Sequence, residues 1–327
     1  MAKALIRITA AAFNKSIEYA LHDPPDWEAS SAKIRRAISR LPQGTLYPSD
    51  HGRTVEFYVS VDGKQRHISK DAATIHNLAK KKYLCILLDI LLLTNSTRKK
   101  DIQRRHKLIE RLKKLIETFE RGKLDLRQIV LTNQQYHWFT GEFVRKRIDA
   151  DKAIRTACGI LVRSKSERDI VNYSEGLAVP LHYEERMLVY VKPLVDELER
   201  ELKQEGLFNR ELYRYINGNI NWNVPPEYAW INTRGSIWKS YHPPTGKIMI
   251  FNDFRIMLAD GSILIHEHSG LMSKFRYRQN ETERIAVMKI TGSVDRNHLI
   301  ETYEQEIDTP EKLIDIIEKY ILPRLWF

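Results

Sequence analysis

The sequence is poor in cysteine, which excludes a disulfide-stabilised scaffold. Its 327 residues include two cysteines, Cys85 and Cys158, and they lie far apart in the chain. Small secreted domains held by disulfides carry several cysteines at regular spacing. We therefore expect a protein of a reducing, intracellular compartment.

Long hydrophobic runs are missing as well. The most apolar stretch, residues 83–94, has 12 residues and contains Asp89, whereas a helix that crosses a bilayer needs about 20 apolar residues. The N-terminus shows no apolar signal core followed by a cleavage site of small residues. These absences predict a soluble protein without a membrane part, in which residues 83–94 form a buried helix.

Positive charge is what the sequence has in excess. The formal net charge is +11, and residues 64–120 contain 15 Lys or Arg against 6 Asp or Glu. A basic excess of this size favours an anionic partner, of which nucleic acid is the commonest. Residues 64–120 could thus be an arm that contacts phosphates. The same charges could also be the ordinary solvated face of a helical hairpin.

The first half of the chain predicts helices interrupted by a β-hairpin. Residues up to about Leu41 have a helical pattern with a break at residues 23–25. Residues 54–60 and 64–68 predict two strands joined by an Asp62-Gly63 turn. Helical patterns follow at residues 71–120 and 134–147. A chain of this length accommodates two or three domains, which we place at residues 1–45, 46–160 and 161–327.

The second half predicts an α/β fold in which helices flank a mixed central sheet. Its expected order is helix, three strands, helix, strand, helix. The segments are 166–177, 181–190, 248–258, 262–268, 280–290, 298–303 and 310–320.

Two acids on neighbouring predicted strands are the main candidates for chemistry. Asp253 and Glu267 flank the Asp260-Gly261 turn, so a hairpin can bring both carboxylates to one end of the sheet. Hard oxygen ligands that converge in this way favour Mg²⁺ or Mn²⁺. Glu267 could instead end its strand by emerging into water. The hydrolase interpretation would fail if the two side chains pointed apart, or if either acid were locked in an ion pair with a deeply buried arginine.

Two histidines beside Glu267 suggest zinc as another metal that the chain could bind. By β-strand alternation, His266 and His268 face the side opposite Glu267 and point the same way. Such a pair can bind zinc, but a zinc site needs a third ligand, and the sequence does not single one out.

Several motifs, in order, resemble one branch of the PD-(D/E)XK nuclease superfamily. They begin with Arg-Ser-Lys-Ser-Glu at residues 163–167 and continue with Pro180 and Tyr183-Glu184. Asp253-Phe254, Glu267-His268 and the stretch 297–309 follow. The first half shows companion features of this branch, Leu-Pro-x-Gly at residues 41–44 and Leu-Ala-Lys-Lys-Lys-Tyr at residues 78–83. The resemblance implies a restriction-endonuclease-like core at residues 161–327, preceded by a mostly helical region with a β-hairpin.

The resemblance also implies roles for particular residues. Asp253 and Glu267 match the two metal-binding acids, and Glu167 matches the helix acid that completes the metal site. The catalytic set it implies is Glu167, Asp253, Glu267 and Lys289, with Mg²⁺ or Mn²⁺ as cofactor. Residues that would contact nucleic acid are Arg163, Lys165, His268 and Arg284.

The sequence departs from the family pattern where a catalytic lysine is expected. Asn252 stands in place of a proline, His266 in place of an aromatic residue, and Ser269 in place of the lysine two residues after Glu267. This branch draws its cation from elsewhere, often from a neighbouring helix. Lys289 is the best candidate and Arg284 the next, although Lys289 could be an ordinary surface lysine.

The resemblance predicts a metal-dependent endonuclease that hydrolyses phosphodiester bonds, with DNA favoured over RNA as the partner. Two alternatives stay open. One is a catalytically inactive nuclease-fold protein that binds nucleic acid or has a regulatory role. The other is a partner-triggered effector in antiviral defence or counter-defence. Members of the branch are mostly encoded by bacteria, phages and mobile elements, so we expect the bacterial cytoplasm.

An insertion at about residues 191–247 separates the first two predicted core strands. It begins with an amphipathic helix at residues 192–204 and continues with a segment rich in aromatic residues and asparagine. Such a segment could stack on nucleic-acid bases. It could equally pack a small subdomain or form a homodimer or protein-partner interface, and packing is the favoured interpretation.

Overall fold

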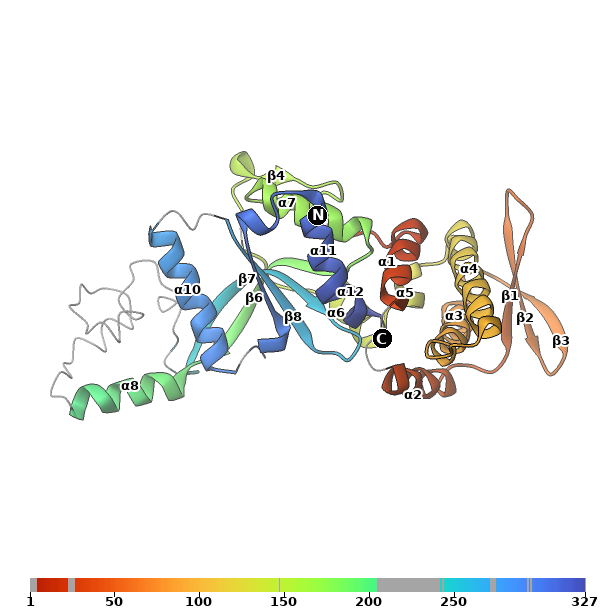
Figure 1. The fold of residues 1–327 in the computed structure, drawn as a ribbon, viewed down its shortest axis with the longest axis horizontal. Coiled ribbons are helices and arrows are strands. Elements are labelled where there is room, and N and C mark those ends of the chain that lie inside the picture. The colour runs from red at the N-terminus through yellow and green to blue at the C-terminus, as the bar shows by residue number, and fades with distance from the viewer. Residues whose placement is uncertain are drawn as a thin grey trace.

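The structure is a computed structural model, and it describes residues 5–22, 27–146, 148–204, 242, 244–270, 275–292, 294 and 296–326. Figure 1 shows a sheet with its helices in one part of the molecule and the N-terminal helices with a β-hairpin in the other. The aromatic and asparagine-rich part of the insertion, residues 205–241, lies outside the described residues.

The N-terminal half contains the expected helices and hairpin. Its elements are α1 (Ala10–His22), α2 (Trp27–Ser39), β1 (Thr45–Asp50), β2 (Val55–Val61), β3 (Lys64–Ile68), α3 (Ile75–Leu92), α4 (Lys99–Arg121), α5 (Leu126–Val130) and α6 (Asn133–Thr140). Strands β2 and β3 form the predicted hairpin. Strand β1, which the sequence did not predict, pairs antiparallel with β2. It contains Pro48, a residue that is tolerated in a strand at the edge of a sheet.

Helices α3 and α4 differ in how deeply they are buried. Helix α3 buries residues along most of its length, from Ile75 to Leu91. The buried residues of α4 all lie in its second half, from Leu112 to Phe119. The first half of α4, which carries several of the basic residues of segment 64–120, is therefore exposed to solvent.

The C-terminal half is built around a four-stranded mixed sheet. Its elements are β4 (Ile154–Arg155), β5 (Leu161–Val162), α7 (Lys165–Gly176), β6 (Leu181–Tyr190), α8 (Lys192–Gln204), β7 (Lys247–Met257), β8 (Ile263–Ser269), α10 (Phe275–Ile290), β9 (Leu299–Tyr303), α11 (Pro310–Ile316), a π-helical turn (Ile317–Ile321) and α12 (Leu322–Leu325). The strand order is β6-β7-β8-β9. The first two pairings are antiparallel, and β8 runs parallel to β9.

Helices cover both faces of this sheet, as the sequence predicts for an α/β fold. Phe254 and Ile256 belong to the larger apolar cluster, to which α7 and α11 also contribute. Ile248, Ile250 and Ile265 belong to a second cluster with residues of α10. Burial of apolar surface on both sides explains why these strands have nearly continuous apolar sequences.

The N-terminal helices share one core with the C-terminal half. The larger apolar cluster contains buried residues from Ile6 to Trp326, and α1 contacts both α4 and α12. The indole of Trp326 donates a hydrogen bond to Ser16 Oγ at 2.7 Å. The amide of Gln135 donates to the carbonyls of Met257 and Leu325, each at 3.0 Å. The predicted boundaries at residues 45 and 160 thus fall within a continuous core and stay predictions.

Helix α6 ends earlier than the sequence predicts. The pattern at residues 134–147 predicts one helix, but α6 stops at Thr140 before Gly141. The chain beyond it folds back, so that Trp138 and Phe143 each stack on the ring of His182 with centroids 3.9 Å apart. These aromatic residues pack the core, as the spacing suggests. Within the part of the chain that the structure describes, no helix is long and apolar enough to cross a membrane.

Candidate metal centre

Strands β7 and β8 bring Asp253 and Glu267 side by side. Phe254 pairs with His266, so the next step of the register places Asp253 opposite Glu267. At this point of the sheet, two backbone N–H groups donate to carboxylate oxygens. Asp253 N donates to Glu267 Oε2 at 3.3 Å, and His268 N donates to Asp253 Oδ2 at 2.9 Å. The exposed fractions of Asp253 and Glu267 are 2% and 0%, so Glu267 does not emerge into water.

Helix α10 contributes a third acid, Glu281, which the sequence reasoning missed. Glu281 is buried, and one oxygen from each of Asp253, Glu267 and Glu281 lies within 4.8 Å of the other two. We call these three residues the acid triad. A signal for Glu281 was available, because it precedes Arg284 by three residues and therefore shares its face of the helix.

Arg284 provides the positive charge within the acid triad. Its Nη2 lies 2.6 Å from Glu267 Oε2, 2.5 Å from Glu281 Oε1 and 3.8 Å from Asp253 Oδ2. Its Nη1 donates to the carbonyl of Phe251 at 2.6 Å. Of the two cations that the sequence offered in place of the missing lysine, Arg284 is thus the one that reaches the acids.

Lys289 lies elsewhere on α10. Its side chain is 39% exposed and pairs with Glu301 on β9. Glu301 pairs with Glu267 in the register of β8 and β9. Lys289 therefore contacts the acid on the strand next to Glu267 and not Glu267 itself. Among the described residues, its ion pair is with Glu301 and not with the acid triad.

Arg163 gathers a second group of acids next to the acid triad. Its Nη2 lies 2.5 Å from Glu184 Oε1, 3.2 Å from Asp253 Oδ1 and 3.3 Å from Glu167 Oε1. Glu184 is buried and has a positive φ of 53°. Its neighbours in β6 pair with Phe254 and Asn252, which places Glu184 opposite Asp253. Asp253 is therefore the residue that joins the two groups.

Glu167 has a local structural role at the start of α7. It forms a capping box with Ser164, in which Ser164 N donates to Glu167 Oε2 at 2.9 Å and Glu167 N donates to Ser164 Oγ at 3.1 Å. Glu167 Oε2 also accepts hydrogen bonds from Arg163 N at 2.7 Å and from the hydroxyl of Tyr183 at 2.8 Å. Glu167 is not part of the acid triad. Lys165, at the first position of α7, is exposed.

The two histidines of β8 point to the same side, as strand alternation predicts. His266 Nε2 lies 2.8 Å from Thr302 Oγ1, and His268 Nδ1 lies 3.2 Å from the same oxygen. His268 Nε2 lies 3.2 Å from Glu304. The acid triad is the only group of three convergent metal-ligand residues among the described residues, and neither histidine belongs to it.

Among the side chains that the structure describes, carboxylates outnumber arginines in this part of the core. Five acids surround two arginines, and they are Glu167, Glu184, Asp253, Glu267 and Glu281. Burial raises the pKa of Glu267 well above its usual range, and the charges of Asp253 and Glu281 raise it further against the opposing effect of Arg284. Burial likewise raises the pKa values of Glu184 and Glu281. Such a cluster favours the uptake of protons or of a further cation.

The acid triad offers the donor set that a hard divalent cation prefers. All three donors are carboxylate oxygens, which suit Mg²⁺ and Mn²⁺ better than zinc. Arg284 already lies against Glu267 and Glu281. An ion bound at the acid triad would therefore share these carboxylates with the guanidinium group or displace it.

Comparisons of the chain with protein-family models, with curated proteins and with solved structures found no match in any of the three. The resemblance to PD-(D/E)XK nucleases consequently depends on the motifs of the sequence alone, and the arrangement of the acids comes from the structure.

Proposed function

We propose that the protein is a metal-dependent endonuclease that hydrolyses phosphodiester bonds, with DNA as the favoured substrate. The observation that carries this proposal is the convergence of Asp253, Glu267 and Glu281 within 4.8 Å of one another. Carboxylates directly opposite one another repel and destabilise a sheet. Their concentration in the core is therefore costly for stability and typical of a site that binds a cation.

In this proposal the acid triad holds Mg²⁺ or Mn²⁺. A bound ion of this kind lowers the pKa of a coordinated water and stabilises negative charge on a phosphate. Arg284, which contacts the acids from α10, takes the place of the lysine that is missing after Glu267 and contributes positive charge next to the substrate. Arg163 holds Asp253 Oδ1 in position through its 3.2 Å contact.

The distribution of charge supports a nucleic-acid substrate. Residues 64–120 carry 15 basic against 6 acidic residues, and the first half of α4, within this range, is largely exposed. An exposed basic helix binds the phosphate backbone without reading the base sequence. We propose that this part of the chain holds the nucleic acid, and this predicts binding that weakens steeply as the salt concentration rises.

A second candidate function is a nuclease-fold protein that binds nucleic acid without cutting it. The observation in its favour is the pairing of Arg284 with Glu267 and Glu281. A guanidinium group at this position neutralises the carboxylates that a metal ion would otherwise use. If the arginine stays in place, the cluster is a structural charge network and the chain has no hydrolytic centre.

A cleavage assay with matched variants distinguishes the two candidates. Labelled duplex DNA, single-stranded DNA and RNA are incubated with the full chain in Mg²⁺, Mn²⁺ or EDTA. The nuclease proposal expects cutting that needs metal, that Asp253→Asn abolishes and that Glu301→Gln retains, because Glu301 is paired with Lys289 outside the acid triad. Thermal melting of each variant establishes that it is folded.

The opposite result favours the second candidate. If the folded chain binds the nucleic acids in a salt-dependent manner, cuts none of them with either metal, and binds equally well as Asp253→Asn, then the nuclease proposal is wrong. Cutting that persists unchanged in Asp253→Asn would also refute it, because the active centre would then lie elsewhere.

A further inference from the structure

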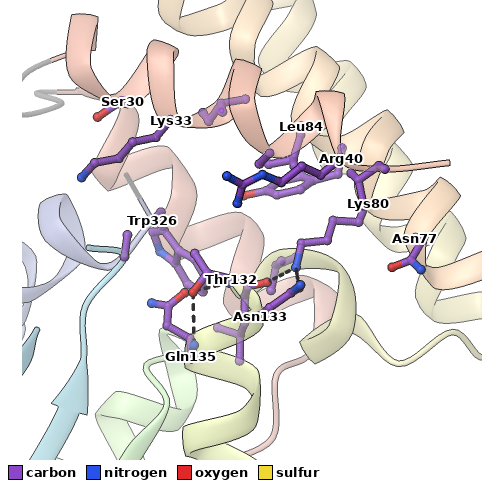
Figure 2. A pocket seen from close by; sticks show the side chains of 17 residues that line it. Ser30, Lys33, Arg40, Asn77, Lys80, Leu84, Thr132, Asn133, Gln135 and Trp326 are labelled. Atoms are coloured by element: carbon purple, nitrogen blue, oxygen red, sulfur yellow. Dashed lines mark hydrogen bonds between the residues drawn. The ribbon is translucent and has the colours of Figure 1, made fainter. Parts of the chain in front are cut away.

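A pocket of about 400 Å³ lies between the N-terminal helices and the C-terminal half. Its lining comes from α2, α3, the connection from α5 to α6, Ala259 next to the β7–β8 hairpin, and Trp326 near the C-terminus. Figure 2 shows Arg40 and Lys80 reaching in from the side of α2 and α3, with Thr132, Gln135 and Trp326 facing them. A volume of this size is within the usual range for sites that bind small molecules.

The pocket is positively charged. Lys33, Arg40 and Lys80 line it, and no aspartate or glutamate occurs among the described residues of its lining. Asp260 is not part of this lining, but it interacts electrostatically with Lys33. Burial opposes ionisation of Asp260, but hydrogen bonds from Ser262 and the charges of Lys33 and His298 lower its pKa. Asp260 also accepts two hydrogen bonds from Ser262, and it forms no ion pair with Lys33, Arg40 or Lys80 among the described residues.

Lys80 is a buried cation without an acidic partner. It is 8% exposed, and its Nζ donates to the carbonyl of Leu131 at 2.6 Å and to Asn133 Oδ1 at 2.9 Å. Both acceptors are neutral. A buried charge normally has an oppositely charged partner, and the described residues provide none here. An anion in the pocket would supply it.

Arg40 provides a group that can bind such an anion directly. It lies one residue beyond the end of α2 and is exposed, and no side-chain hydrogen bond or ion pair joins it to a described residue. Its guanidinium group points into the pocket in Figure 2. Guanidinium groups bind the oxygens of phosphates in a two-pronged geometry.

The pocket lining also contains apolar side chains. Ile34, Leu84 and Trp326 contribute to it, and the exposed fraction of Trp326 is 6%. A ligand that suits the whole pocket therefore combines a strongly negative group with an apolar or aromatic body. A phosphate monoester has this chemistry, because its charge of about −1.5 to −2 at neutral pH matches several cations.

We infer that this pocket binds the phosphate monoester of an organic molecule with a ring, such as a nucleoside monophosphate or the 5′-phosphate end of a nucleic acid. The phosphate contacts Arg40 and Lys80, Lys33 adds positive charge to the lining, and the ring packs against the apolar side chains of the pocket. This inference does not depend on the proposed nuclease activity, because none of the pocket residues belongs to the acid triad.

Isothermal titration of the full chain in EDTA tests the inference. The probes are AMP, adenosine, inorganic phosphate and a short single-stranded DNA with either a 5′-phosphate or a 5′-hydroxyl. We expect AMP to bind more tightly than phosphate and adenosine, and the 5′-phosphate to strengthen binding of the oligonucleotide. Tighter binding of AMP than of the phosphorylated oligonucleotide identifies a free small molecule as the ligand, and the reverse order identifies a strand end.

Variants of exposed residues link the binding to the pocket. Arg40→Ala is expected to weaken AMP binding about tenfold or more, and Lys33→Ala together with Arg40→Ala to abolish it. Arg35→Ala is the matched control, because Arg35 lies on α2, is exposed and does not line the pocket. The inference is wrong if AMP and the phosphorylated oligonucleotide fail to bind at about 10 mM, a concentration that fills even a very weak site. It is equally wrong if Arg35→Ala weakens binding as much as Arg40→Ala.

Discussion

Arg284 on α10 and Glu267 on β8 form an ion pair of 2.6 Å in the interior of the protein. Glu267 is fully buried, and the side chain of Arg284 is 13% exposed. The pair explains how a carboxylate can exist in a fully buried part of the sheet. It also creates the main question about this site, which is whether the arginine is a permanent partner of the acid or shares it with a metal ion.

Arg284→Met should destabilise the protein strongly. The variant leaves Glu267 and Glu281 buried without their guanidinium partner, and loss of one member of a buried pair costs about 3 to 5 kcal/mol. Urea unfolding measures the change. Lys289→Met is the control on the same helix, and we expect it to cost less than about 1 kcal/mol because its pair with Glu301 is partly exposed. Equal losses for the two variants would contradict the importance of the buried pair.

Divalent metal should stabilise the folded protein through the acid triad. At one hundred times its dissociation constant, a bound ion adds about 2.7 kcal/mol to the free energy of unfolding. Thermal melting with and without Mn²⁺ measures this effect, which Asp253→Asn or Glu281→Gln should remove. Glu301→Gln should retain it. If Mn²⁺ raises the melting temperature of all four proteins equally, the ion binds elsewhere.

Glu167 should act on stability more than on metal binding. Its carboxylate caps α7 and accepts from Tyr183, so Glu167→Ala is expected to cost about 1 to 3 kcal/mol. Ser164→Ala, which removes the other half of the capping box, should cost about 1 kcal/mol. The melting shift produced by Mn²⁺ should be unchanged in Glu167→Gln. Loss of that shift would instead support the metal-binding role that the sequence resemblance implies.

Lys80 should make stability depend on pH in the alkaline range. Burial lowers its pKa from 10.5 to about 8, so between these values the unfolded chain binds more protons than the folded one. The contribution of Lys80 to stability therefore increases as the pH rises from 8 to 10.5, by on the order of 2 to 3 kcal/mol.

Unfolding of wild type and Lys80→Met at pH 7.5 and at pH 10 measures this effect. The variant lacks the titrating group. The free energy of unfolding of wild type relative to the variant should therefore be larger at pH 10 than at pH 7.5. A difference that stays constant, or that moves the other way, would show that Lys80 is not desolvated in the folded state.

The sequence predicted the elements of the fold well where local patterns were strong. The β2–β3 hairpin follows from Asp62-Gly63, and α8 has the predicted bounds, residues 192–204. The failures have local causes. Strand β1 was missed because Pro48 weakens its alternating pattern. Helix α6 was predicted too long because the aromatic residues continue past Gly141 into a segment that packs on His182.

The candidate site was predictable only in part. The hairpin that joins β7 and β8 fixes the register, so the proximity of Asp253 and Glu267 is determined by the sequence of two adjacent strands. The contributions of Glu281, Arg284 and Glu184 depend on how α10 and β6 pack on those strands. No local pattern encodes that packing.

By itself, then, the sequence determined a basic chain with an α/β core and two neighbouring acids on a hairpin, because alternation and turn chemistry act over a few residues. Only the tertiary structure decided that Arg284 rather than Lys289 meets those acids, that Glu281 completes the acid triad, and that Lys33, Arg40 and Lys80 line one pocket. The physical reason is that long-range electrostatics and burial depend on distances between segments far apart in the chain, and those distances exist only once the core has formed.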